Sequence, residues 1–323
     1  MSNSFVGQIS IPPNLLAIDG ITRSGKFWLA ELITYFEGME PVLHEPVLDF
    51  ISIKAHYGEL DKTSAVDLFR NIVSHKCFTT SIGRNLNTRL DDSSSIYRHP
   101  RRADFLNRVH QMRGAEFEKI KTVNFDEVTY PMLAHDWLSV WGVQAAALPA
   151  MKLIRVERNP IDLVYAWYDT GIGLKEMVFA HRFTKDGKSV PWFANDFCEN
   201  FESQSEVDRI INCIAHLFDT AFPVMNDLLN SDDGNLLVTS YERLGEDMSA
   251  EVERISSHIG LRPIPQMTGF LATQEKKGRS RLIVDEARTR KLESLKAMTS
   301  RDSFAKLQTL VERYKEFART INC

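Results

Sequence analysis

The sequence has few cysteines and no long apolar run. Its 323 residues include four cysteines without C-x-x-C spacing, which favours reduced thiols over a disulfide framework. No apolar run approaches the roughly 18 residues that a membrane-spanning helix needs. The N-terminal segment MSNSFVGQISIPPN has no basic stretch followed by an apolar core, so we expect no secretory signal. We therefore expect a cytoplasmic protein without a membrane span.

Charge and motif content argue against several other classes of protein. A net charge of −4 is unlike that of a nucleic-acid-binding protein. The histidines and cysteines show no metal-ligand spacing, so we predict no metal site. No G-x-S-x-G nucleophile motif occurs. We interpret residues 1–323 as one domain, and a homo-oligomer is compatible with the sequence.

What the sequence does contain is an alternation of short apolar segments with helical patterns. Strands are expected at 15–18, 41–46, 151–156 and 236–239. Helices are expected at 25–37, from 159 onward and at 250–259, with a helical insertion at about 61–125 and a helical C-terminal region at about 284–320. This alternation is typical of an α/β fold with a central, mostly parallel sheet flanked by helices.

A glycine-rich loop follows the first predicted strand. The segment DGITRSGKFW places Thr22, Arg23, Ser24, Gly25 and Lys26 between that strand and a helix. Backbone N–H groups at such a helix start attract anions. The loop almost matches the nucleotide-binding pattern G-x-x-x-x-G-K-[ST], which predicts a fold of the P-loop nucleotide-binding type. However, Phe27 stands where a Mg²⁺-binding hydroxyl belongs, which weakens a kinase interpretation.

A second motif follows the predicted strand at 151–156. Arg158-Asn159-Pro160-x-Asp162 places an N-cap residue and a first-turn proline directly after an arginine. Asp162 is expected to organise this helix end through local hydrogen bonds. Ligands of parallel sheets bind beyond the carboxyl ends of the strands, so both motifs are expected in one site.

At this point the sequence resembles the sulfotransferase family, whose donor is 3′-phosphoadenosine 5′-phosphosulfate (PAPS). Residues 22–28 resemble the family's first loop, P-[KR]-S-G-T-T-[WL], and residues 158–168 resemble R-N-[PA]-x-D-x-x-x-S-x-[YW]. LLVTSYERLGEDMSAEVERISSHIGL at 236–261 and QEKKGRSR at 274–281 are similar to two later family segments. The four segments occur in the family's order over residues 15–281.

The resemblance implies roles for individual residues. The loop from Thr22 to Phe27 would bind the 5′ end of PAPS, and Tyr241 would lie near the adenine. The 3′-phosphate would be bound by Arg158 and by the cluster of Lys276, Lys277 and Gly278. Arg23 would stabilise the leaving oxygen, with Lys26 as a possible second cation. No metal is needed for this transfer.

The acceptor would be a small molecule or a carbohydrate, and its hydroxyl or amine needs a base. Glu45 is our first choice and His44 the second, with Glu127 and His135 in reserve. The acceptor pocket is expected to be built from the segments at about 50–120 and 170–200.

Three positions depart from the family pattern. Lys26 and Phe27 replace two threonines that commonly meet the 5′-phosphate, and Ala166 replaces a serine that commonly meets the 3′-phosphate. At about 1 kcal/mol per lost hydrogen bond, donor affinity could fall by about 10²-fold. Two alternatives therefore stay open: a non-catalytic or altered-donor protein on a sulfotransferase scaffold, and a P-loop nucleotide-dependent kinase.

Overall fold

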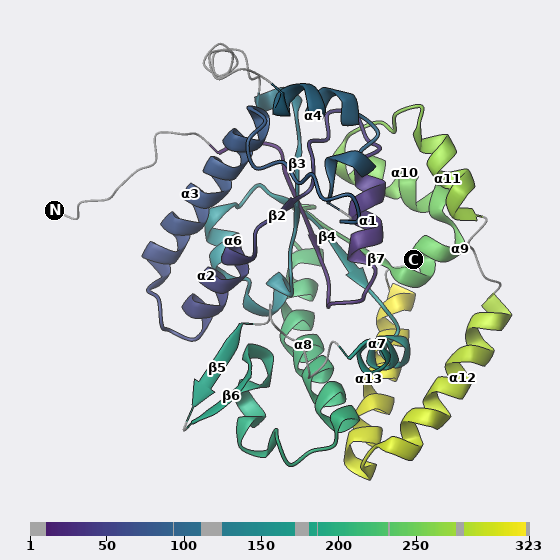
Figure 1. Ribbon diagram of the computed structural model, residues 1–323. Coiled ribbons are helices and arrows are strands. Elements are labelled where there is room, and N and C mark those ends of the chain that lie inside the picture. The colour runs from purple at the N-terminus through teal and green to yellow at the C-terminus, as the bar shows by residue number, and fades with distance from the viewer. Residues whose placement is uncertain are drawn as a thin grey trace.

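The centre of the molecule is a five-stranded sheet in which every neighbouring pair is parallel (Figure 1). The computed structural model describes residues 11–92, 94–110, 125–171, 181–185, 187–231, 233–275 and 281–320. The strands are β1 (Leu15–Asp19), β2 (Leu43–His44), β3 (Tyr130–Leu133), β4 (Lys152–Glu157) and β7 (Leu236–Ser240), in the order β2-β3-β1-β4-β7. The expected central parallel sheet flanked by helices is confirmed.

The two faces of the sheet are covered by different helices. Because side chains alternate along a strand, Leu15 and Ala17 of β1 face one layer, whereas Leu16 and Ile18 face the other. The first layer contains α2 (Pro46–His56), α3 (Lys62–Ser81) and α6 (Gly142–Ala147). The second contains α1 (Lys26–Ile33), α9 (Tyr241–Glu246), α10 (Met248–Ile259) and α11 (Met267–Glu275). All the residues of β1 are buried, as in a strand covered on both sides.

A third apolar cluster lies where α7 (Pro160–Asp169) packs against α8 (Glu206–Leu229) and the C-terminal helices α12 (Arg281–Met298) and α13 (Arg301–Thr320). A further α-helix is α4 (Arg102–Val109), and β5 (Arg182–Lys185) and β6 (Lys188–Pro191) form an antiparallel hairpin. Short 3₁₀ helices span Ile96–Arg98, Phe125–Glu127, Trp137–Val140 and Trp192–Asn200. Within the described part of the chain, no helix is long and apolar enough to cross a membrane.

Strand β3 was not predicted, because proline lacks the N–H that a central strand normally donates. Pro131 lies opposite Leu16 of β1, but β2 pairs with β3 only from Met132 onward. The N–H of Tyr130 donates to the carbonyl of Asn14, just before β1. Backbone groups of successive strand residues point to opposite sides, so the backbone nitrogen of Pro131 faces the other side, where β2 has not yet begun. The sheet therefore accepts a proline in a strand that has a neighbour on each side.

The order of the strands determines where a ligand can bind. From β1 the chain proceeds to β2 and β3 on one side and then to β4 and β7 on the other. β1 therefore lies at the topological switch point, and ligands of such sheets bind beyond the carboxyl ends of the strands there. The glycine-rich loop and the segment after β4 both begin at this edge.

Candidate active site

The glycine-rich loop makes a tight turn that presents backbone N–H groups. Gly25 has φ 105°, and a Cβ there would lie 2.6 Å from Cδ2 of Tyr241, so the position requires glycine. The first N–H groups of a helix lack partners within it. Among the described residues, the N–H groups of Gly25, Lys26 and Phe27 donate to no backbone carbonyl. The arrangement suits an anion at the start of α1.

Lys26 lies beneath the loop, not at its surface. Its side chain is fully buried, and Nζ donates to the carbonyl oxygens of Gly20 and Ala134, both at 2.8 Å. Burial lowers the pKa of Lys26, and the charges of Asp136 and Asp19 oppose this shift. The ammonium thus ties the loop to the residue that follows β3. Of the two cations predicted to stabilise the leaving oxygen, Arg23 is exposed and Lys26 is buried.

The floor of the loop is a buried ion network. The carboxylate of Asp19 accepts hydrogen bonds from Nη1 of Arg155 at 2.7 Å and from the N–H groups of Trp137 and Leu138. Burial raises the pKa of Asp19, but Arg155 and Lys26 outweigh it and lower the pKa overall. A kinase would need an acid to hold Mg²⁺, and the oxygens of Asp19, which ends β1, are already used within the protein.

The motif after β4 holds the loop directly. Nη1 of Arg158 donates to the carbonyl oxygen of Arg23 at 2.7 Å, and Nε1 of Trp167 donates to that of Thr22 at 2.7 Å. The Arg158 guanidinium lies 4.4 Å from the ring centroid of Tyr241, which is 39% exposed. Nε of Arg158 is buried without a hydrogen-bond partner among the described residues. The two motifs expected to share a site are therefore in contact.

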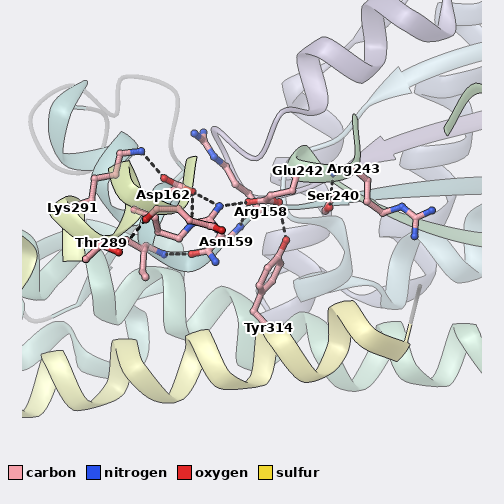
Figure 2. A network of polar contacts seen from close by, with 12 residues as sticks. Arg158, Asn159, Asp162, Ser240, Glu242, Arg243, Thr289, Lys291 and Tyr314 are labelled. Atoms are coloured by element: carbon pink, nitrogen blue, oxygen red, sulfur yellow. Dashed lines mark hydrogen bonds and ion pairs between the residues drawn. The ribbon is translucent and has the colours of Figure 1, made fainter. Parts of the chain in front are cut away.

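The residues beside Arg158 are fixed by the C-terminal helices (Figure 2). Asn159 caps α7 by accepting from the N–H of Ile161 at 3.0 Å, while its own N–H donates to Glu242. Asp162 accepts from Arg288 of α12 at 2.7 and 2.9 Å and also pairs with Lys291. The hydroxyl of Tyr314 donates to Glu242 at 2.8 Å (Figure 2). These bonds position the start of α7.

Two histidines lie at the same edge of the sheet. His44 ends β2 and His135 follows β3, with ring centroids 5.1 Å apart. Nδ1 of His135 lies 3.3 Å from Oδ2 of Asp49, whose other oxygen accepts from Nε1 of Trp137 at 2.6 Å. Partial burial and then the charge of Lys26 lower the pKa of His135, and Asp49 opposes this shift. His135 is thus oriented by a carboxylate and neutral at pH 7.

Sequence reasoning did not find Asp49 or Asp136. Asp136 is buried beside Lys26 in a left-handed conformation with φ 56°, and its Oδ1 has no hydrogen-bond partner in the described part of the chain. Burial raises the pKa of Asp136 to about 7, although Lys26 acts against this. The described residues contain no group of three or more His, Cys, Asp or Glu side chains placed to hold a metal ion.

The other sequence candidates have different surroundings. Glu45 pairs with Lys76 through an Oε2–Nζ distance of 2.9 Å. Glu127 precedes β3 and therefore lies at the opposite edge of the sheet. Ser24 is buried in the loop, with no partner for Oγ among the described residues. Lys276, Lys277 and Gly278 lie outside the described residues.

The fold and the site define an α/β protein in which a glycine-rich loop and an arginine motif meet at the carboxyl edge of a parallel sheet. The chain belongs to the sulfotransferase family and is a transferase: the model of the sulfotransferase domain matches residues 16–305. No curated protein sequence matches it.

Several solved structures are similar. The sulfotransferase domain of the Synechococcus PCC 7002 olefin synthase has a TM-score of 0.46 and 12% identity, covering 96% of this chain and 98% of that one. Sulfotransferase STF1 of Mycobacterium tuberculosis H37Rv has a TM-score of 0.41 and 12% identity, covering 83% of this chain and 72% of that one. Mouse sulfotransferase SULT7A1, solved with PAP, has a TM-score of 0.38 and 14% identity, covering 95% of this chain and 89% of that one.

Proposed function

We propose that this protein transfers a sulfuryl group from PAPS to a hydroxyl or amine of a small-molecule or carbohydrate acceptor, without a metal. The observation that carries the proposal is the contact between the two motifs. Arg158 and Trp167 bind consecutive carbonyls of the loop, so the loop's N–H groups and the Arg158 guanidinium form one cationic edge. A donor with phosphate groups at both ends of a nucleoside matches such an edge.

The donor would be held by groups of different kinds. The N–H groups of Gly25, Lys26 and Phe27 suit the 5′ end, together with the hydroxyls of Thr22 and Ser24. Arg158 suits the 3′-phosphate, because its Nε has no partner within the described residues. Tyr241 offers a half-exposed ring to the adenine. The cluster of Lys276, Lys277 and Gly278 is assigned to the 3′-phosphate from the family pattern alone.

In the transfer, the acceptor oxygen bonds to sulfur while the bond from sulfur to the phosphate oxygen breaks. The exposed guanidinium of Arg23 would stabilise the charge on the leaving oxygen. The acceptor proton would pass to Nε2 of His135, because Asp49 holds Nδ1. A positioned base of this kind contributes about 10²–10⁴-fold to a rate. We prefer His135 to Glu45 because Glu45 is paired with Lys76. His44 is the second choice, since its ring adjoins that of His135.

An altered-donor protein on this scaffold is the second candidate, and the position of Lys26 favours it. The threonine hydroxyl of the family loop is replaced by a cation that points away from the ligand edge. A kinase is disfavoured by two features: Phe27 offers no hydroxyl to Mg²⁺, and Asp19 is engaged by Arg155.

Thermal unfolding with the product nucleotide, adenosine 3′,5′-bisphosphate (PAP), tests the proposal. At 100 times its dissociation constant a ligand stabilises the folded state by about 2.7 kcal/mol. We expect PAP in EDTA to raise Tm by several degrees, and Mg-ATP to do so less. Arg158→Gln should reduce the PAP shift, whereas Arg70→Gln, on the exposed surface of α3, should not. No shift with millimolar PAP would contradict PAPS as the donor, and a larger shift with Mg-ATP would favour a kinase.

A further inference from the structure

A cleft opens beside the end of β2, close to the two histidines. It has a volume of about 430 Å³ and lies between residues 41–44, the last part of α3, residues 85–92 and Ser94. Small-molecule sites typically measure about 300–1,000 Å³. His44 is part of its wall, and the His44 ring centroid is 5.1 Å from that of His135. A molecule in this cleft would therefore lie next to the proposed base.

Polar side chains predominate in the cleft wall. They comprise two cations, one acid, two amides and two hydroxyls, namely Lys76, Arg89, Asp92, Asn85, Asn87, Thr80 and Ser94. The charges nearly balance, since Lys76 pairs with Glu45 and the positive charge of Arg89 acts on Asp92. A wall of this kind suits a ligand with many hydroxyl groups and little net charge.

One group in the wall points to a missing hydrogen-bond partner. Thr80 is fully buried, and its Oγ1 has no partner among the described residues. Buried hydroxyls in native proteins are nearly always bonded. The neighbouring Thr79 is satisfied, because its Oγ1 donates to His75 and accepts from Asn85 at 3.1 Å. A ligand hydroxyl in the cleft would supply the bond that Thr80 lacks.

We propose that this cleft binds the acceptor and that the acceptor is a sugar or another polyol, an inference that rests on the sulfuryl transfer proposed above. One acceptor hydroxyl faces His135, where its proton is removed as its oxygen bonds to the sulfur of PAPS and PAP leaves. The remaining hydroxyls bond the polar wall. An apolar phenol is disfavoured because it gives the buried hydroxyl of Thr80 no partner, at about 1–3 kcal/mol. A site built to bond hydroxyls discriminates strongly against analogues without them.

Acceptor kinetics of the full chain test this inference. PAP formation from PAPS is measured with hexose glycosides and lactose as polyol probes and with 4-nitrophenol as the apolar probe. Thr80→Val should raise KM for the sugar about 3–10-fold, as expected for one lost hydrogen bond. Its kcat and its thermal shift with PAP should stay unchanged. Arg89→Gln should also raise KM. The matched controls, Thr309→Val on the exposed face of α13 and Arg70→Gln on α3, should change neither parameter.

The outcomes separate this inference from the donor proposal. If PAP stabilises the wild type but no sugar is sulfated, or 4-nitrophenol is the better acceptor, the polyol assignment is wrong while the donor site stands. If a sugar is sulfated with unchanged KM in Thr80→Val and Arg89→Gln, the acceptor binds elsewhere. If PAP stabilises no variant and PAPS is not consumed, the donor proposal fails, and the acceptor assignment fails with it.

Discussion

Replacing Lys26 by methionine should destabilise the protein strongly. Lys26→Met leaves the buried carbonyls of Gly20 and Ala134 without their donor, at about 1–3 kcal/mol each. It also removes the positive charge that acts most strongly on the buried Asp136. The variant also no longer has to bury an ammonium group, which offsets part of this cost. Breaking a buried charge pair by removing one partner typically costs about 3–5 kcal/mol, and we expect a value in that range.

Urea unfolding measures this change directly. Asp136→Asn in the Lys26→Met background should recover part of the loss, with a coupling of about 0.5–3 kcal/mol in a double-mutant cycle. Lys54→Met removes a lysine that pairs with Glu59 at the surface, and it should cost less than about 1 kcal/mol. PAP affinity of Lys26→Met should change far less than its stability. A variant as stable as the wild type that has lost PAP binding would show that the ammonium faces the ligand instead.

Further substitutions test the proposed base, its orientation, the loop and a buried histidine. His135→Gln should lower kcat about 10²–10⁴-fold. Because the pKa of His135 is lowered, the wild-type rate should rise with pH, with the midpoint of the rise below pH 6.5. A midpoint above pH 7 would contradict this assignment. Asp49→Asn should lower kcat at least tenfold with KM for PAPS unchanged, and equal kcat would remove Asp49 from the mechanism. Gly25→Ala should abolish the PAP shift, since its Cβ would meet Tyr241 at 2.6 Å, and normal binding would refute that crowding. Burial lowers the pKa of His99 to about 3, so between pH 6.5 and 3 the unfolded chain binds a proton at His99 that the folded chain does not. As the pH falls through this range, His99 should lower the free energy of unfolding by about 1.4 kcal/mol per pH unit. His99→Gln should remove this contribution, and an unchanged pH dependence in the variant would contradict it.

The sequence predicts those parts of the fold that depend on local patterns. The apolar runs of β1, β4 and β7 stand out against polar surroundings, and Asn159-Pro160 predicts the start of α7, which the structure confirms. The helix expected at 25–37 ends at Ile33, four residues before its expected end. β3 was missed because Pro131 argues against a strand unless one knows that its neighbour β2 is only two residues long.

The site was harder to predict because its contacts join distant segments. A loop pattern specifies a lysine at position 26, but only Ala134, far along the chain, shows that the ammonium points inward. Similarly, nothing near His135 in the sequence indicates that Asp49 orients it. Glu45 lies in the region where the family pattern places a base, and the sequence around it does not show that it is paired. Its pairing with Lys76 depends on how α3 packs against the end of β2. Local sequence therefore places His44, Glu45 and His135 at the carboxyl edge of the sheet without ranking them.

The most direct test compares two nucleotides by isothermal titration in EDTA. PAP and adenosine 5′-phosphate differ only in the 3′-phosphate, which we assign to Arg158 together with the cluster of Lys276, Lys277 and Gly278. The wild type should bind PAP at least about tenfold more tightly, since a charged hydrogen bond is worth about 1.5–3 kcal/mol. Arg158→Gln should remove most of that preference, whereas Arg23→Gln should weaken both nucleotides alike. Equal wild-type affinities, or a full preference in Arg158→Gln, would contradict a donor site built from these two motifs.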